Sequence, residues 1–426
     1  MAAKAPHGEG LLLMPERRTE RGWKAMNERL REPHTVCWKL EDPESALAPV
    51  SASDRQALAE AAELLRRGET VAFPTETVYG LGANAQSTEA VQRIFAAKGR
   101  PSDNPLIVHI ADRSALEGLV TEVPPAAAAL MDAYWPGPLT VVLPLRGGAV
   151  SPRVSAGLDT VGIRMPDHPV ALALLTAAGC PVAAPSANRS GRPSPTTAAH
   201  VLDDLAGAVG GVLDGGAAGV GLESTVIQVL DDGKVAVLRP GGITAEQLAA
   251  VVGADAVLPP APPVDFTAPA DAVKPPASGD DAAGPDAART DAGGSGPAPR
   301  APGMKYAHYA PRGELRIVRA SSPQAAAKAA AGLLAEAAAR GETTGLLLFE
   351  EHVPLYPAGA AACTVSLGPL AGLEAAARTL YAALRRFDEA GATYILAEAC
   401  PEEGLGAAVM NRLLKAAAGR VIEAGR

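Results

Sequence analysis

The stretch between residues 259 and 302 constrains the fold more than any other part of the chain, because it is almost entirely Pro, Ala, Gly, Asp and Ser. Phe266 is its only aromatic residue, and large aliphatic residues are nearly missing from it. Such a composition cannot bury enough apolar surface to offset the entropy lost on ordering. We therefore predict a flexible linker over residues 259–303. It divides the 426-residue chain into two units, each long enough to bury a core of its own.

Short apolar runs alternate with helical patterns on both sides of this linker, which predicts two α/β units. In residues 35–258 we expect strands at 35–40, 71–73, 106–110, 139–143, 161–165, 182–184, 212–213, 224–230 and 235–238. We expect helices there at 53–67, 88–98, 114–119, 125–134 and 169–178, and two more that begin near 197 and 244. In residues 313–426 we expect strands at 314–319, 345–349, 364–367 and 393–398, and helices at 322–340, 369–388 and 405–418. Strands separated by long helices predict a small parallel sheet covered by helices in this second unit.

Local signals fix some of these boundaries. Ser53-x-x-Gln56 and Thr244-x-x-Gln247 have the spacing of a capping box, so we expect helices to begin there. Ser87 or Thr88 is the expected cap of the helix that carries Val91, Ile94 and Phe95 inward. The Asp-Gly pair at residues 232–233 predicts a hairpin turn, because such turns need a positive φ.

Bulk properties exclude several classes of protein. The chain has 38 basic and 47 acidic residues, a net charge of −9, whereas a protein that coats nucleic acid is usually basic. It has no run of about 18 apolar residues, so we expect no membrane span. The four cysteines show no C-x-x-C spacing, which indicates neither a zinc knuckle nor a redox pair. We expect reduced thiols in a cytoplasmic protein, with residues 1–34 a disordered or weakly ordered extension.

The stretch from residue 73 to residue 110 carries the clearest signal of a binding site. A short strand leads into threonines and glycines, and a helix then ends on two basic residues. Hydroxyls, backbone N–H groups exposed by glycines, and cations at a helix end are suited to holding phosphate, although no Walker A motif is present. These residues are Thr75, Thr77, Gly80, Gly82, Lys98 and Arg100.

Single residues within this pattern have two readings. His109 shares a strand face with Ile107, so it is either a structural histidine or a ligand-binding one. Lys98 and Arg100 are also ordinary partners of a helix dipole at its C-terminal end. Arg164 is harder to explain structurally, because a guanidinium within an apolar strand must find an anion or other acceptors.

Taken together, the polar candidates point to one pocket. Each lies near the beginning or end of a predicted strand, where loops of an α/β domain gather into a cleft. Hydroxyls, amides and cations favour a small, polar, anionic ligand, and no catalytic triad or metal motif is present. The chemistry is therefore expected to use positioning and charge stabilisation. The candidates are Thr75, Thr77, Lys98, Arg100, Asn104, Thr140, Arg164, Ser186, Asn188, Arg192, Ser224 and Arg239.

Five separated motifs resemble the YrdC/Sua5 family, the threonylcarbamoyl-AMP synthases, over about residues 36–250. They are PTETVYGLG at 74–82, KGRP with NPL at 98–106, SAN with SG at 186–191, ESTV at 223–226, and LRPG at 238–241. The sequence PGMKYAHYAP at 302–311, with the α/β tail, is similar to the long two-domain Sua5 form.

The resemblance implies a twisted α/β YrdC-type domain with an open concave cavity at 35–258. It also implies a covering segment at 304–312 and a small Rossmann-like parallel α/β domain at 313–426. The implied enzyme is a nucleotidyltransferase that makes threonylcarbamoyl-AMP and pyrophosphate from L-threonine, bicarbonate or CO₂, and ATP. Its product passes to the tRNA threonylcarbamoyl transferase machinery for modification of adenosine 37. No stable nucleic-acid or membrane partner and no prosthetic group are implied, and Mg²⁺ is expected through the ATP phosphates.

The resemblance also implies roles for single residues. Those expected to hold L-threonine are Thr77, His109, Arg164 and Ser224. Those expected to hold ATP are Lys98, Arg100, Asn104, Thr140, Ser186, Asn188, Ser194, Arg239 and Tyr309. Lys305 and Tyr306 are further candidates for the covering segment.

Two rival functions fit parts of the pattern. An RNA-binding module could use Lys98, Arg100 and Arg192 along a cleft, but the negative net charge and the few aromatic residues disfavour it. A carbamoyl-transferring domain of the hydrogenase-maturation kind has the same fold. The missing zinc-finger cysteines and acylphosphatase-like segment disfavour this second rival.

Overall fold

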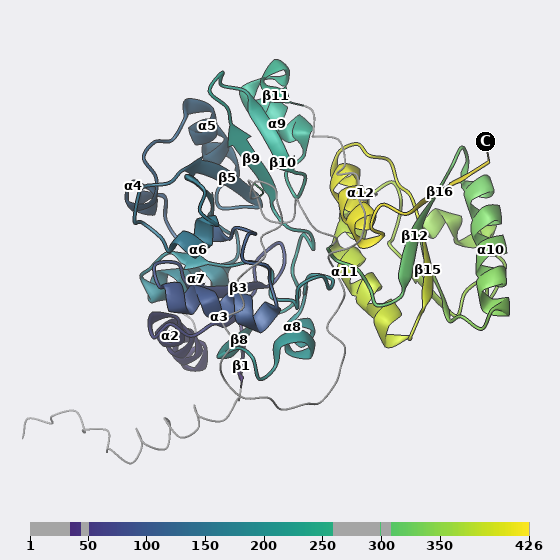
Figure 1. The fold of residues 1–426 in the computed structure, drawn as a ribbon, viewed down its shortest axis with the longest axis horizontal. Coiled ribbons are helices and arrows are strands. Elements are labelled where there is room, and N and C mark those ends of the chain that lie inside the picture. The colour runs from purple at the N-terminus through teal and green to yellow at the C-terminus, as the bar shows by residue number, and fades with distance from the viewer. Residues whose placement is uncertain (1–34, 44–50, 259–298, 300–307, 426) are drawn as a thin grey trace, which may run out of the picture.

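The computed structural model describes residues 35–43, 51–258, 299 and 308–425. The expected extension at 1–34, almost all of the expected linker, and the candidates Lys305 and Tyr306 lie outside the described residues. Figure 1 shows two α/β units side by side, the first built from residues 35–258 and the second from residues after 308. The predicted fold class, an α/β unit followed by a smaller parallel α/β unit, is confirmed.

A mixed sheet runs through the whole first unit. Within the described ranges it has eleven strands in the order β1-β8-β2-β3-β7-β4-β6-β5-β9-β10-β11. These are β1 (Val36–Lys39), β2 (Val71–Phe73), β3 (Gly80–Asn84), β4 (Ile107–His109), β5 (Leu139–Pro144), β6 (Thr160–Arg164), β7 (Val182–Ala183), β8 (Gly211–Asp214), β9 (Thr225–Val229), β10 (Val235–Arg239) and β11 (Val257–Leu258). The helices are α2 (Ala52–Arg66), α3 (Thr88–Lys98), α4 (Leu116–Leu119), α5 (Pro125–Tyr134), α6 (Pro152–Ser155), α7 (Pro169–Ala178), α8 (Ala198–Leu205) and α9 (Ala245–Val252), with 3₁₀ turns η2 (Arg113–Ala115) and η3 (Ala254–Ala256).

Strand alternation separates two cores on the two faces of this sheet. In β2, Ala72 belongs to the core that contains α3 and α5, whereas Val71 and Phe73 belong to the core against α2 and α7. Successive side chains of a strand point to opposite faces, so the wholly apolar β2 is buried on both sides.

The helix α3 begins and ends as the sequence predicts. The side chain of Ser87 accepts a hydrogen bond from the backbone N–H of Ala90, and Gly99 ends the helix at φ +62°. Val91, Ile94 and Phe95 are buried, so Lys98 is placed at the inner end of the helix. The predicted capping box at Thr244 and Gln247 is present as well.

The predicted cap of α2 is wrong. The cap of α2 is Ser51, which accepts from the N–H of Asp54; Ser53 is not the cap. Asp54 is buried and also accepts from the N–H groups of Glu41 and Asp42, so the earlier start ties the helix to the chain that leaves β1.

Of the two glycines predicted to expose N–H groups to a phosphate, Gly80 lines a polar cavity and Gly82 does not. Gly80 and Gly82 lie in β3, antiparallel to β2, and the intervening N–H of Leu81 donates to the carbonyl of Pro185. A Cβ on Gly82 would lie 2.8 Å from Val182 and 2.9 Å from Phe73. These glycines therefore allow close packing of the sheet.

The second unit is a parallel sheet covered by helices on both faces, as predicted. Its strand order among the described residues is β14-β13-β15-β12-β16. The strands are β12 (Glu314–Ala320), β13 (Thr344–Leu348), β14 (Cys363–Ser366), β15 (Tyr394–Glu398) and β16 (Val421–Ala424), and the last of them was not predicted. The helices are α10 (Pro323–Ala339), α11 (Leu373–Glu389) and α12 (Leu405–Ala416), with a 3₁₀ turn η4 (Glu350–Leu355).

Helices α11 and α12 cover the face of the small sheet that is turned toward the first unit, and α10 covers the far face (Figure 1). The core under α11 and α12 includes Val78, Leu222 and Tyr309 from outside the second sheet. Gly221, at φ +79°, comes so close that an added Cβ would lie 2.4 Å from the Cα of Arg378 in α11. The two units therefore share buried contacts.

Candidate active site

A polar cavity opens where several strands of the first unit end. It contains about 730 Å³ of space free of protein atoms, its open mouth included. Eleven predicted polar site residues line it: Thr75, Thr77, Lys98, Arg100, His109, Arg164, Ser186, Asn188, Ser224, Arg239 and Tyr309. His109, Arg164 and Arg239 are the last residues of β4, β6 and β10, so the expectation that strand ends bring these side chains together is confirmed.

Four other candidates do not line the cavity but contact its walls or lie behind them. Thr140 Oγ1 lies 2.7 Å from Ser224 Oγ, and Ser194 donates to Glu223 Oε1 at 2.6 Å. Asn104 is 1% exposed, and within the described part of the chain its side-chain amide has no hydrogen-bond partner. Arg192 points instead to carboxylates at the boundary with the second unit.

One end of the cavity combines a buried cation with a neutral imidazole. Arg164 is paired in register with His109 across the parallel strands β6 and β4. Its Nη2 lies 2.6 Å from Oε1 of Glu76, and its Nη1 donates to Thr77 Oγ1 at 2.8 Å. Burial, helped by the charge of Arg164, lowers the pKa of His109 to about 3. His109 is therefore uncharged at neutral pH and can act here as a hydrogen-bonding group.

Ser224 and Arg239 form the neighbouring wall. Arg239, 4% exposed, donates from Nη2 to the carbonyl of Ser224 at 2.9 Å and to its hydroxyl at 3.2 Å. Burial lowers the pKa of Arg239 from its usual value. These contacts place a hydroxyl and a guanidinium next to each other at the start of β9 and the end of β10.

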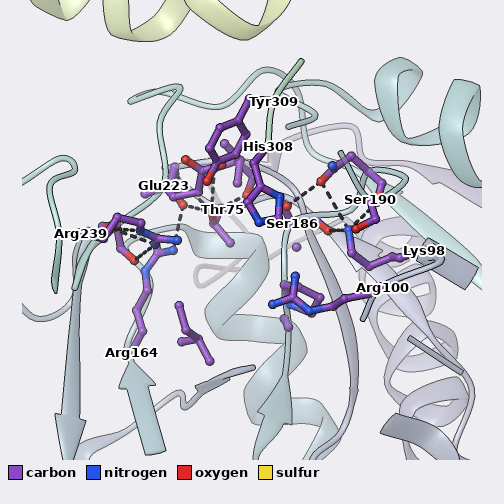
Figure 2. A pocket seen from close by; sticks show the side chains of 18 of the residues that line it. Thr75, Lys98, Arg100, Arg164, Ser186, Ser190, Glu223, Arg239, His308 and Tyr309 are labelled. Atoms are coloured by element: carbon purple, nitrogen blue, oxygen red, sulfur yellow. Dashed lines mark hydrogen bonds between the residues drawn. The ribbon is translucent and has the colours of Figure 1, made fainter. Parts of the chain in front are cut away.

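The opposite side carries Lys98 and Arg100, as Figure 2 shows, with His308 and Tyr309 at the mouth. Lys98 is 4% exposed and donates from Nζ to the carbonyls of Ser186 and Asn188. Arg100 donates to the carbonyls of Asn104 and Pro105, and burial lowers its pKa to about 10. The two basic residues thus lie at a cavity wall, and Lys98 also holds the loop that follows β7.

Glu223 is the main lining residue that the site prediction left out. It accepts from Ser194, from the hydroxyl of Tyr381 at 2.8 Å and from Nε of Arg412 at 3.0 Å, the last two belonging to α11 and α12. Burial alone would raise its pKa, but Arg412 and Arg239 hold the pKa at about 2. A glutamate directly before the Ser-Thr pair that opens a strand was a signal in the sequence, but Tyr381 and Arg412, its partners in the second unit, lie about 160 to 190 residues away.

Ser190 and His308 also line the cavity without a predicted role, and the predicted Thr75 lines it beside Thr77. Thr75 Oγ1 lies 2.7 Å from Thr77 Oγ1 and donates to the carbonyl of Val78. Tyr309 has φ +69°, and its ring centroid lies 5.2 Å from that of Tyr381 in α11. Residues 308–309 therefore meet both units at the mouth of the cavity.

Comparisons with known proteins cover both units. A family model described as "Telomere recombination" matches residues 63–241, and one described as "Threonylcarbamoyl-AMP synthase, C-terminal domain" matches residues 243–418. The threonylcarbamoyl-AMP synthase of Bacillus subtilis is 49% identical over 373 residues, which span 88% of this chain and 96% of the relative. That of Pyrococcus abyssi is 43% identical, with 85% and 94% covered.

A solved structure agrees with these sequence matches. The crystal structure of Pyrococcus abyssi Sua5 complexed with L-threonine is 39% identical and superposes with a TM-score of 0.75, covering 91% of this chain and 99% of that one. The resemblance drawn from the five motifs is thus confirmed. Since these relatives extend through both α/β units and the segment between them, the chain belongs to the family of two-domain, Sua5-type threonylcarbamoyl-AMP synthases.

Proposed function

We propose that this protein is an L-threonylcarbamoyladenylate synthase, a nucleotidyltransferase that converts L-threonine, bicarbonate or CO₂, and ATP into threonylcarbamoyl-AMP and pyrophosphate. One observation carries the proposal. A single cavity joins an end suited to an amino acid, with Arg164, Ser224 and a neutral His109, to a wall with Lys98 and Arg100 that is suited to phosphates. The names of the relatives and the L-threonine complex of one of them support it.

At the amino-acid end, Arg164 would pair with the carboxylate of L-threonine, and the hydroxyls of Thr77 and Ser224 would complete the polar contacts. The deprotonated amine of L-threonine attacks the carbon of CO₂ and forms a carbamate, releasing one proton. With a pKa of about 3, His109 is too weak a base to take that proton efficiently at neutral pH. Its part is to orient the substrate as a neutral hydrogen-bonding group.

At the nucleotide end, a carbamate oxygen would attack the α-phosphorus of ATP while the bond to pyrophosphate breaks. Arg100 and Lys98 would stabilise the charge that grows on the leaving group. Arg239 would contact the nucleotide from the other wall. The unpartnered amide of Asn104 supports a binding role, because a buried amide without a partner is costly unless a ligand satisfies it.

Mg²⁺ would enter with ATP. Among the described residues, no three His, Cys, Asp or Glu side chains are grouped so that they could hold a metal ion. The lining is rich in cations and hydroxyls, and its carboxylate Glu223 is in contact with Arg412. This donor set fits an ion held by the phosphates, where it would lower their negative charge.

His308 and Tyr309 would cover the bound substrates. A carbamate decomposes readily in water, so excluding solvent protects the intermediate. Both residues line the cavity mouth, and Tyr309 is packed against Tyr381 of the second unit. Whether Lys305 and Tyr306 also take part stays a prediction.

The setting of this activity is part of the proposal. The product would pass to the machinery that transfers the threonylcarbamoyl group to adenosine 37 of tRNA. No helix of the described residues is long and apolar enough to cross a membrane. The four cysteines are free thiols, which supports a reducing compartment such as the cytoplasm.

Release of pyrophosphate tests the proposal directly. The purified protein, incubated with ATP, bicarbonate and L-threonine, is expected to release pyrophosphate, and mass spectrometry should detect threonylcarbamoyl-AMP. Omitting L-threonine should abolish the release. Equal release without L-threonine would refute the synthase activity.

A further inference from the structure

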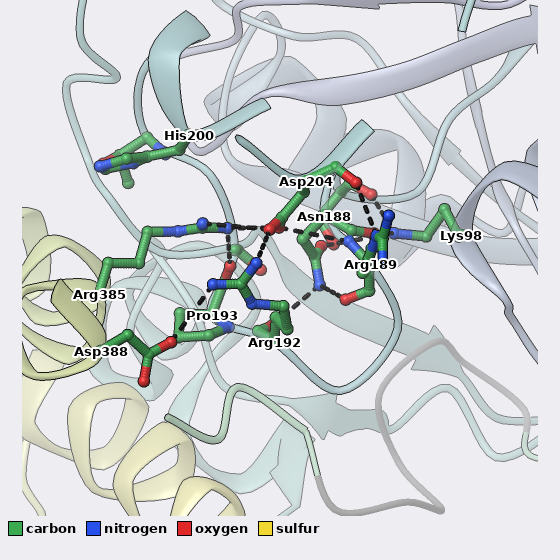
Figure 3. A network of polar contacts seen from close by, with 12 residues as sticks. Lys98, Asn188, Arg189, Arg192, Pro193, His200, Asp204, Arg385 and Asp388 are labelled. Atoms are coloured by element: carbon green, nitrogen blue, oxygen red, sulfur yellow. Dashed lines mark hydrogen bonds and ion pairs between the residues drawn. The ribbon is translucent and has the colours of Figure 1, made fainter. Parts of the chain in front are cut away.

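Four charged side chains form a junction between the two units beside the cavity wall. Asp204 of α8 is 1% exposed, and its Oδ2 accepts from Nη2 of Arg385 in α11 at 2.7 Å. Arg192 contacts Asp204 with Nη1, and its Nη2 lies 3.3 Å from Oδ2 of Asp388, also in α11. Two guanidinium groups thus face two carboxylates, one of each from either unit (Figure 3).

The junction holds the loop at residues 186–194, which forms one wall of the cavity. Arg385 donates to the carbonyl of Pro193 at 2.6 Å, and the N–H of Arg189 donates to Asp204. On its inner side the same loop accepts from Lys98 and presents Ser186, Asn188 and Ser190 to the cavity. The loop is therefore fixed between a cavity lysine and helix α11 of the second unit.

Asp388 also contacts residues 308–312, the described part of the segment that leads into the second unit. Its Oδ1 accepts from the N–H of Arg312 at 2.6 Å. Two residues earlier, the N–H of Ala310 donates to the carbonyl of Gly191 at 2.9 Å, in the loop itself. Tyr309 lies one residue before Ala310, the first of these anchors in the chain, and three before Arg312, the second, so the placement of this tyrosine and the shape of the loop depend on the same helix.

Asn188 connects the junction to the lining. Its side-chain amide donates to the carbonyls of Arg189 and Arg192, at 2.8 and 2.9 Å, while its Oδ1 accepts from Ser186 Oγ at 2.6 Å. Two hydrogen bonds through Asn188 thus connect the backbone carbonyl of Arg192 to the Ser186 hydroxyl.

We propose that Arg385 and Asp388 are positioning residues for the active site: through Arg192, Asp204 and Pro193 they hold the 186–194 loop, and through Arg312 they hold residues 308–312, in the arrangement that receives the nucleotide. The proposal gives the second unit an indirect role in ATP binding. Its residues at this junction would shape the binding site without touching ATP. The inference deepens the proposed function and rests on it for the kinetic part of its test.

The variants Arg385→Ala and Asp388→Asn test this role. Asp388→Asn removes the charge that faces Arg192 but keeps an oxygen that can accept from Arg312. Arg386→Ala and Glu389→Gln are matched controls, because these neighbours in α11 are 70% and 63% exposed and pair only loosely with each other, at 3.7 Å. Arg385→Lys tests for rescue, since lysine restores the charge but not the forked contact.

The kinetic readout separates positioning from general destabilisation. We expect the KM for ATP to rise on the order of ten-fold in Arg385→Ala and Asp388→Asn, because a small displacement of binding groups weakens binding strongly. The KM for L-threonine should stay within about two-fold of the wild type, since that end is held by β4, β6 and Glu76. Arg385→Lys should recover part of the effect, and the controls should match the wild type. An equal rise in both KM values would overturn the proposal.

Hydrogen exchange provides a second readout that does not depend on activity. The amides of Arg189, Ser190 and Ala310 should exchange faster in both variants and at the wild-type rate in the controls. Unchanged exchange in folded Arg385→Ala and Asp388→Asn proteins would overturn the proposal. If the wild-type protein does not use ATP, the proposed function fails, and the exchange result alone decides this inference. If Arg385→Ala does not fold, Asp388→Asn decides it.

Discussion

Nη2 of Arg164 lies 2.6 Å from Oε1 of Glu76, with the two side chains only 5% and 12% exposed. The sequence indicated that the guanidinium of Arg164 needs an anion or other acceptors. The carboxylate of Glu76 is that anion, and it is in place before any substrate binds. This pair has consequences for stability and for catalysis that can be measured separately.

The variant Glu76→Gln is expected to lower the free energy of unfolding by about 3–5 kcal/mol, because it leaves the buried Arg164 without its anion. Urea unfolding measures this loss. Glu63→Gln is the control, because Glu63 pairs with Arg66 and Arg67 on an exposed helix face, where ion pairs add little to stability. Equal losses in the two variants would contradict the structural importance of the buried pair.

Arg164→Ala and Arg239→Ala should affect different substrates. We expect Arg164→Ala to raise the KM for L-threonine by about ten-fold or more, the loss associated with a charged hydrogen bond, and to change the KM for ATP little. Arg239→Ala should do the reverse. Initial rates of pyrophosphate release at varied substrate concentrations give both values. A pattern with the substrates exchanged would reverse the assignment of the two ends.

Acid should destabilise the protein well above pH 4. Burial lowers the pKa of His109 and His308 to about 3 and that of His200 to about 4, against about 6.5 in an unfolded chain. The unfolded state therefore binds more protons in this range. The stability is fully present above about pH 6.5 and is lost as the pH falls toward 3.

Urea unfolding at pH 7.5, 6 and 5 measures that slope. His200→Gln, outside the cavity, should reduce it by up to about 1.4 kcal/mol per pH unit, the contribution of one proton. An unchanged slope in His200→Gln would show that this histidine is not held neutral by the fold.

Gly221→Ala should separate the two units. The added Cβ would lie 2.4 Å from the Cα of Arg378, and the residue already has φ +79°. Gly148→Ala is the matched control, because Gly148 has φ +77° and nothing within 4 Å of an added Cβ. Small-angle scattering should show a larger radius of gyration for Gly221→Ala alone. Equal radii of gyration for the two variants would mean that α11 shifts to accommodate the added methyl group, and would contradict the prediction.

Tyr309→Ala should slow turnover or weaken ATP binding, because the ring covers the cavity mouth and packs on Tyr381. Tyr309→Phe keeps that ring and should behave more like the wild type. Steady-state kinetics and ATP titration give the comparison. Wild-type kinetics in Tyr309→Ala would remove the covering role.

Sequence patterns predicted those parts of the fold that depend on neighbours in the chain. The α3 helix was readable because Ser87 and Gly99 mark its ends and the buried residues follow its period. The β9–β10 hairpin was readable because Gly233 supplies φ +80°. In contrast, β3 was not predicted, because Gly80 and Gly82 are typical of a loop in the sequence. Their reason for being in a strand, the close packing against Phe73 and Val182, depends on distant residues.

The site was predictable to the extent that strand ends collect polar residues. His109, Arg164 and Arg239 meet because β4, β6 and β10 end at the same side of the cavity. Pairwise partners were not predictable: nothing near Arg192 in the sequence indicates that its charge is directed to Asp388, 196 residues away. Such contacts depend on how the two units pack against each other.

Helix α11 carries Tyr381, Arg385 and Asp388 at spacings of four and three residues, which places them on one face. A helix turns by about 100° per residue, so inserting one residue before Tyr381 would rotate that whole face away from the first unit. The contact between the two units therefore depends on the rotation of α11 about its own axis as well as on which residues it carries. Over evolution, length changes should be rare inside α11 and should accumulate in the connections outside it.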